Sequence, residues 1–358
     1  MSSTPSLGAP LDEVVSDPAL YPFQVDWLRR QALIAKVDDG FFERAAFLDQ
    51  SALTHAPPSR WVALDELEAR IGISAQGGNG GLGLVFHVGH CGSTLISRLL
   101  GAAQAVQSLR EPLPMRDLAL RWSARDMPWS VEAPARVRAD AGVLRALWRR
   151  IKPPQALSVV KATSFCGVVS CDWLHWHQDD RALFVSVRPE IYLASMLADD
   201  RNELDIRLSI PQRLMSVVQR LDAPPEPYYA LSPGAKAALA YACEAVNYAD
   251  ALDAHPDRAA VLDFDDYLAD PPARLRALFG FYGVDVDAAE VERILASNVP
   301  RRYSKDVAHA YGPGDRARRL RETSRRRGED IQAGLSWLDE FATSNALVGA
   351  ALDRLAKA

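Results

Sequence analysis

Two glycines, a histidine, a cysteine and two hydroxyl residues stand together at positions 89–94, in the order Gly-His-Cys-Gly-Ser-Thr. The glycines allow a tight turn and close backbone approach, and Ser93 and Thr94 can cap a helix that starts there. The first N–H groups of a helix have no partner within it and point outward. This pattern predicts a binding site for an anion such as phosphate or sulfate. A strand–turn–helix without a ligand is the alternative.

The residues on both sides of this turn predict the elements that hold it. The apolar run Leu84–Phe86 indicates a buried strand, and apolar residues at helical spacing follow over 94–103. Further strands are predicted at 105–109, 156–161, 181–187 and 259–263, with helical patterns between them. Strands that alternate with helices are typical of a mostly parallel sheet covered on both faces. The predicted fold class is therefore α/β, a three-layer sandwich.

The first 80 residues differ from the rest of the chain. Residues 1–20 are rich in Ser, Pro and Gly, which favours an extended or mobile segment. Residues 22–53 carry Phe and Trp at a spacing that predicts helices, and a glycine-rich connector occupies 77–81. We therefore predict a mobile segment and helical extension over 1–80 and an α/β domain over 81–358.

Composition limits the classes of partner. The net charge of −5 gives no reason to expect nucleic-acid binding. Four cysteines form neither a disulfide framework nor a zinc pattern, and Cys91, at a helix start, is a candidate reactive thiol. A secretory signal and a run of membrane-spanning length are both lacking, so a cytoplasmic protein is expected. The oligomeric state is not indicated.

The loop lies between a predicted strand and a predicted helix, as a Walker A motif does, but it lacks the residues of that motif. That motif ends in Gly-Lys-Ser/Thr, whose Lys contacts the terminal phosphates, whereas Gly92 here is followed by Ser93 and Thr94. This disfavours a nucleoside triphosphatase or an ordinary kinase.

A run of arginines at 316–327 is the strongest local charge feature of the sequence. It fits either a solvated helical face or a lid over an anionic ligand.

The loop resembles the first motif of the sulfotransferase superfamily, which reads Pro-Lys/Arg-Ser-Gly-Thr-Thr between a strand and a helix. Its donor is 3′-phosphoadenosine 5′-phosphosulfate (PAPS), and its fold is related to that of P-loop nucleoside triphosphate hydrolases. The resemblance places Gly89, His90, Cys91, Gly92, Ser93 and Thr94 on the donor's phosphosulfate. His90 stands where the family has a fixed cation, so its charge depends on pH. The chain resembles an atypical, bacterial-type member.

Two further segments resemble the family's site for the donor. Arg188 ends a predicted strand and Ser195 follows on a helix, which resembles the pair that holds the 3′-phosphate. The segment 302–305, Arg-Tyr-Ser-Lys, resembles one that reaches the nucleotide through Ser304 and Lys305. The segment 261–271 resembles a late structural motif, a strand leading to a capped helix.

The sequence contains no clear motif that identifies the catalytic base. An acceptor must lose a proton as the sulfuryl group moves, so a carboxylate or histidine should lie near the donor. Glu111 follows a predicted strand and lies 21 residues after His90, an offset that resembles tyrosylprotein sulfotransferases. His175 and His177 compete for this role. Lys161, at a strand end, is expected to bind substrate.

The resemblance implies sulfuryl transfer from PAPS to a hydroxyl or amine, with no metal required. Glu111 would take the proton, and His90 would stabilise the leaving phosphate. The acceptor's class is not indicated. The alternatives are a small-molecule kinase on the same scaffold and a degenerate, non-enzymatic nucleotide-binding member.

Overall fold

A five-stranded parallel sheet forms the centre of the molecule, in a computed structural model that describes residues 8–49, 52, 57–74, 80–303, 306–310 and 312–357. Its strands, in the spatial order β5-β6-β4-β7-β8, pair in parallel throughout. They are β4 Leu82–His87, β5 Val106–Arg110, β6 Leu157–Lys161, β7 Arg181–Ser186 and β8 Ala259–Asp263. The predicted α/β class and all five predicted strands are thus confirmed.

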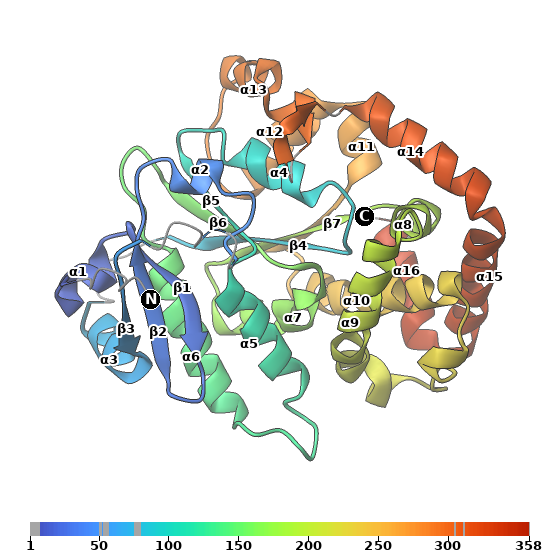
Figure 1. Ribbon diagram of the computed structural model, residues 1–358, viewed down its shortest axis with the longest axis horizontal. Helices are drawn as coiled ribbons and strands as arrows, with labels where there is room; N and C mark the ends of the chain where they lie inside the picture. Colours follow the sequence, from blue (N-terminus) through green and yellow to red (C-terminus); the bar gives the residue numbers. More distant parts are fainter. Residues whose placement is uncertain are drawn as a thin grey trace, which may run out of the picture.

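Helices cover both faces of this sheet (Figure 1). One face carries α4 Ser93–Leu100, α12 Pro271–Phe281 and α13 Ala288–Ala296, and the other carries α5 Leu113–Ser123, α6 Pro134–Trp148 and α7 Ser170–Trp176. Every residue of β4, β5 and β6 is buried. Burial on both faces explains the apolar run Leu84–Phe86 of β4, whereas β5 and β6 also bury the polar residues Gln107, Ser108 and Ser158.

The central strand β4 is the point where the order of the sheet reverses. It lies between β6 and β7, and the chain first moves outward to β5 and later crosses to β7 and β8. In open parallel sheets, ligands bind in the crevice beyond the carboxyl ends of the strands at such a point. The loop after His87 lies at this place.

The N-terminal region forms an antiparallel sheet, so the helices predicted over 22–53 are wrong for most of that range. The strands β1 Leu20–Asp26, β2 Gln31–Lys36 and β3 Ser59–Ala63 pair in this order, and α1 Leu11–Ser16, α2 Phe41–Arg44 and α3 Leu64–Ser74 accompany them. Arg30 has a φ of +54° in the turn between β1 and β2. Edge-to-face contacts of Tyr21, Phe23, Phe41 and Phe42 hold the sheet to α2. The domain boundary at residue 80 stays a prediction.

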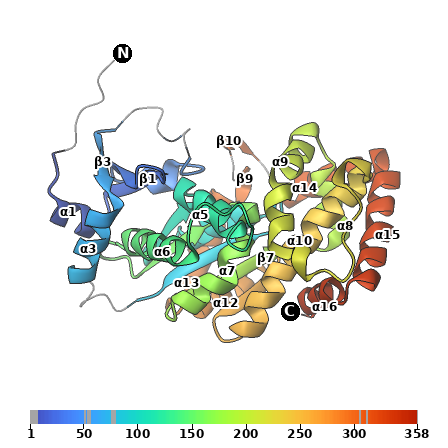
Figure 2. The ribbon, with the colours of Figure 1, turned by 90° about the horizontal axis from the view of Figure 1, so that it is seen from below.

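Helices of the C-terminal half pack around the end of the sheet that lies away from the N-terminal region, as Figures 1 and 2 both show. Its elements are α8 Pro189–Met196, α9 Asp200–Val217, α10 Pro233–Ala254, α11 Phe264–Ala269, the short strands β9 Arg302–Tyr303 and β10 Asp306–Ala310, α14 Pro313–Arg326, α15 Gly328–Ser344 and α16 Ala346–Ala356. The buried helix α10 packs against α15 and α16, and α14 packs against α8. Among the helices of the described residues, none has the length and apolar character needed to cross a bilayer.

Candidate active site

The loop between β4 and α4 turns through three residues in the left-handed region. The φ angles are +104° at Gly89, +51° at His90 and +83° at Gly92. Helix α4 begins at Ser93, and its N-cap is Gly92, which has no side chain to accept a hydrogen bond. Ser93 and Thr94 therefore lie in the first turn of the helix and do not cap it, contrary to the expectation. The N-terminus of α4 is left without a side-chain cap, as an anion site requires.

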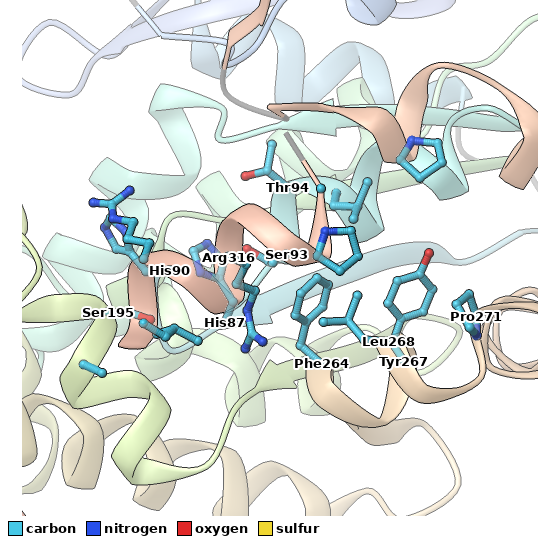
Figure 3. A pocket seen from close by; sticks show the side chains of 18 of the residues that line it. His87, His90, Ser93, Thr94, Ser195, Phe264, Tyr267, Leu268, Pro271 and Arg316 are labelled. Carbon is cyan, nitrogen blue, oxygen red and sulfur yellow. The ribbon is translucent and has the colours of Figure 1, made fainter. Parts of the chain in front are cut away.

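A cavity of about 440 Å³ lies over this loop (Figure 3). The loop and α4 supply His90, Gly92, Ser93, Thr94 and Leu95 to its wall. Residues from β4, β5–α5, α8, α11–α13 and α14 complete the lining, namely His87, Glu111, Ala194, Ser195, Ala198, Phe264, Tyr267, Leu268, Pro271, Pro272, Leu295, Pro300, Gly312, Pro313, Arg316, Arg319 and Leu320. Segments more than 200 residues apart in the sequence thus share one pocket.

Helix α14 supplies two arginines to the cavity wall. Arg316 Nη1 lies 2.6 Å from Asp265 Oδ1, and its guanidinium lies 5.4 Å from the ring centre of Phe264. Arg319 Nη2 lies 2.6 Å from Asp199 Oδ2. The paired carboxylates are not part of the lining. Arg316 and Arg319, called the lid arginines below, thus lie on the cavity wall as the second interpretation expects, whereas Arg318, Arg321, Arg325 and Arg326 are exposed as the first expects.

Aromatic rings form the wall beside Arg316 (Figure 3). Phe264 and Tyr267 stack with ring centres 5.6 Å apart, and burial raises the pKa of Tyr267 to about 12, so its phenol remains protonated. The Phe264 ring also fixes the identity of residue 92. A Cβ atom at Gly92 would lie 2.3 Å from that ring, which leaves space for glycine alone.

Glu111 reaches the cavity from the end of β5 and belongs to a buried polar cluster. Lys161 Nζ lies 2.5 Å from Glu111 Oε1 and 2.9 Å from His87 Nε2. Lys161 is fully buried and does not line the cavity. Its ammonium lies against Glu111 and His87, and its predicted contact with substrate stays a prediction. Glu111 has a φ of +54°. Backbone strain at His90 and Glu111, both on the cavity wall, is typical of functional sites.

Arg188 and Ser195 come from the same helix region but face different surroundings. Ser195 lines the cavity and donates a hydrogen bond to the carbonyl oxygen of Ile191. The Arg188 side chain is 64% exposed, lies 3.3 Å from Glu190 and does not line the cavity. Its predicted contact with the 3′-phosphate stays a prediction.

The other predicted donor residues are separated from the cavity or fall outside the description. Ser304 and Lys305 lie outside the described residues. Gly89 packs near Ser164 instead of the cavity. Cys91 is fully buried, and its thiol donates to the carbonyl oxygen of Val185. Burial raises the pKa of Cys91, so the predicted reactive thiol is wrong.

His175 and His177 lie at the end of α7 and do not line the cavity. Burial lowers the pKa of His177 from 6.5 to about 4, and its ring packs edge-on against Trp173. Between about pH 4 and 6.5, His177 is therefore neutral in the folded protein, whereas the same histidine in the unfolded chain binds a proton. His177 is half-buried beside Trp173, whereas His175 is exposed, and both lie outside the cavity that Glu111 lines.

We predict that this histidine makes the protein less stable as the pH falls from 6.5 towards 4. In that range the unfolded state binds more protons than the folded state, so the free energy of unfolding decreases with decreasing pH. Urea denaturation of the wild type and His177→Gln at several pH values measures the effect. The variant should lose part of the slope below pH 6.5; equal slopes in the two proteins would contradict the prediction.

Sequence reasoning did not single out His87, Phe264 or Tyr267. His87 is the last residue of β4, directly before the glycine loop, and this strand-end position was the available signal for a ligand-facing side chain. Phe264 and Tyr267 lie in the segment interpreted as purely structural, and no local pattern distinguishes a cavity-facing aromatic residue from a core one.

Comparison with known proteins finds solved structures that resemble this chain distantly. No family model matches the sequence, and no curated protein matches it. Among solved structures, the chain resembles the sulfotransferase domain from the curacin biosynthetic pathway, with 14% identity over 78% of this chain and 99% of that chain and a TM-score of 0.43. It also resembles a sulfotransferase from Mycobacterium avium, with 12% identity over 73% and 81% of the two chains and a TM-score of 0.40.

A third resemblance is to retinol dehydratase, solved with androsterone and the inactive cofactor PAP. It has 10% identity over 95% of this chain and 96% of that chain, with a TM-score of 0.37. The solved structures that this chain resembles are thus sulfotransferases and a retinol dehydratase, at identities and TM-scores that do not assign the chain to their family. Likeness at this level assigns no role to any residue.

Proposed function

We propose that the protein is a sulfotransferase that moves a sulfuryl group from PAPS to a hydroxyl or amine. The observation that carries the proposal is the cavity itself: its lining includes an uncapped helix N-terminus, two arginines and the carboxylate residue Glu111. This combination fits a donor with several anionic groups and an acceptor that must lose a proton.

The anionic groups of the donor have suitable partners in the cavity lining. The loop and the first turn of α4 offer backbone N–H groups to the phosphosulfate. Arg316 and Arg319 offer planar guanidinium groups of the kind that match phosphate oxygens. Phe264 and Tyr267 offer aromatic faces to the adenine. Arg188 is the partner of the 3′-phosphate that the motif implies, and it would have to turn away from Glu190 to reach it.

Charge and position supply the chemistry in this proposal. As the sulfuryl group leaves the donor, negative charge develops on the phosphate, and His90 with the α4 N-terminus stabilises it. Glu111 accepts the proton of the acceptor. Holding both molecules in one pocket supplies much of the rate enhancement, because the transfer then becomes effectively intramolecular.

Two arginine variants distinguish the partners of the donor. Arg316→Ala should weaken binding of adenosine 3′,5′-bisphosphate about 10–100-fold, the loss expected for hydrogen bonds to a charged group. Arg188→Ala should weaken it comparably if the motif assignment holds. The matched control is Arg325→Ala. Arg325 is an exposed residue of α14, the helix of Arg316, and lies outside the cavity. Isothermal titration calorimetry gives the affinities.

The outcome of this titration is decisive for Arg316. Unchanged affinity in Arg316→Ala, with correct folding by circular dichroism, would remove Arg316 from donor recognition. A thermal-shift series with adenosine 3′,5′-bisphosphate, ATP with magnesium, and buffer then tests the class of ligand, since a ligand that binds the native state raises the melting temperature. The proposal expects the bisphosphate to give the larger shift.

A further inference from the structure

The buried cluster behind Glu111 has a geometry that the proposed transfer does not by itself explain. Lys161 extends from the end of β6, beside β4 in the sheet. Its Nζ atom lies 2.5 Å from Glu111 Oε1, 2.9 Å from His87 Nε2 and 3.5 Å from the carbonyl oxygen of Ala162. A lysine ammonium has three N–H donors, and three acceptors surround this one.

His87 has a suitable partner in either of two protonation states. With Lys161 donating to Nε2, the neutral ring carries its proton on Nδ1. The same Nε2 atom lies 3.0 Å from the carbonyl oxygen of Ala162. If Nε2 gains a proton, this oxygen is in place to accept a hydrogen bond from it. The Nε2 atom therefore has a hydrogen-bond partner in both protonation states.

The charge balance of the cluster changes when Glu111 accepts a proton. Before transfer, the buried ammonium of Lys161 has the Glu111 carboxylate as its counter-ion. Once that carboxylate is neutral, an unpaired charge would remain in the protein interior, which is costly. The ring of His87 borders the cavity, where the leaving phosphate gains negative charge at the same moment.

We infer that Glu111, Lys161 and His87 form a proton relay, an inference that rests on the proposed function. The acceptor's O–H or N–H bond breaks and its proton goes to Glu111, while the acceptor atom bonds to sulfur and the bond from sulfur to the donor's phosphate oxygen breaks. Lys161 passes one proton to His87 Nε2. The positive charge thus moves from Lys161 to His87, a buried residue of the cavity lining, where it stabilises the product. His87 returns the proton to Lys161 as Glu111 releases its own to solvent.

The relay predicts a defect in turnover and not in binding. His87→Gln keeps a polar group near Lys161 but cannot hold the proton, so kcat should fall about 100-fold or more, the usual scale for lost acid–base catalysis. Affinity for adenosine 3′,5′-bisphosphate should change less than about threefold, because the loop and the arginines proposed to hold the donor are unchanged. His87→Ala opens space on the cavity wall, and added imidazole should restore part of its activity while leaving His87→Gln unchanged.

Labelled PAPS provides the assay, with water and a panel of simple phenols, alcohols and amines as acceptors. His175→Gln is the matched histidine control, since that residue lies on α7 outside the cavity. A wild type that transfers no label to any acceptor would overturn the proposed function and the relay with it. An active wild type with a His87→Gln variant of equal kcat would overturn the relay alone. If His87→Ala fails to fold, the kcat of His87→Gln still decides.

Discussion

Glu111→Gln should lower kcat for sulfuryl transfer by about 100- to 10,000-fold, the range that a general base contributes. The amide has the shape of the carboxylate and can still accept a hydrogen bond from Lys161, but it cannot take the acceptor's proton. Affinity for adenosine 3′,5′-bisphosphate should remain within about threefold, because the loop and the lid arginines are untouched. Steady-state rates with labelled PAPS and calorimetry measure the two quantities.

The control for this prediction has to separate chemistry from stability. Glu111→Gln also removes the counter-ion of the buried Lys161, which destabilises the fold. The double variant Glu111→Gln/Lys161→Met removes the buried charge, so its free energy of unfolding should recover towards that of the wild type while its activity stays low. Activity that recovers together with stability would show that Glu111 acts structurally and is not the base.

Gly92→Ala should destabilise the protein by about 2–4 kcal/mol and abolish binding of the bisphosphate. The residue has a φ of +83°, which costs an L-residue about 1–2 kcal/mol. Its Cβ atom would overlap the Phe264 ring, and overpacking a filled site costs about 1–3 kcal/mol. Because Phe264 is itself held between Tyr267 and Arg316, the loop has to move, and it carries the anion site with it.

Gly142→Ala is the matched control for this substitution. Gly142 lies within helix α6, and no atom lies within 4 Å of the position that its Cβ would take. Alanine should stabilise the helix there by about 0.5–1 kcal/mol. Urea denaturation of both variants gives the comparison. A Gly92→Ala protein as stable as the wild type, with intact binding, would contradict the assigned conformation of the loop.

The central α/β architecture could be predicted because its signals are local. The strand β4 is a short apolar run, the loop that follows contains two glycines, and α4 shows helical spacing within one segment. Burial on both faces makes such strands uniformly apolar, so they can be identified without knowing their neighbours. The predicted order of strands and helices followed from these segments.

The N-terminal sheet was missed because its pattern is ambiguous over short distances. Phe23 and Trp27 are four residues apart, which fits a helix face. A bulge between Pro22 and Gln24 breaks the alternation that would mark a strand, and the turn places the non-glycine residue Arg30 at positive φ. Neither the bulge nor this turn has a clear signature in the sequence.

The composition of the site depends on contacts across the fold. Arg316 was visible only as part of a charged run, and its position over Phe264 results from the packing of α14 against α8. Lys161 was correctly placed at a strand end, but the sequence does not show that its side chain turns inward to Glu111 and His87. Pairings of this kind arise from tertiary structure and have no local pattern.

Transfer of labelled sulfate from PAPS is the measurement that tests the central claim most directly. Purified protein is incubated with the donor and with a panel of hydroxyl and amine acceptors, and Glu111→Gln serves as the negative control. The proposal predicts labelled product and adenosine 3′,5′-bisphosphate in equal amounts with the wild type, and a rate at least about 100-fold lower with the variant. Binding of ATP with magnesium, together with no transfer of sulfate to any acceptor, would contradict it.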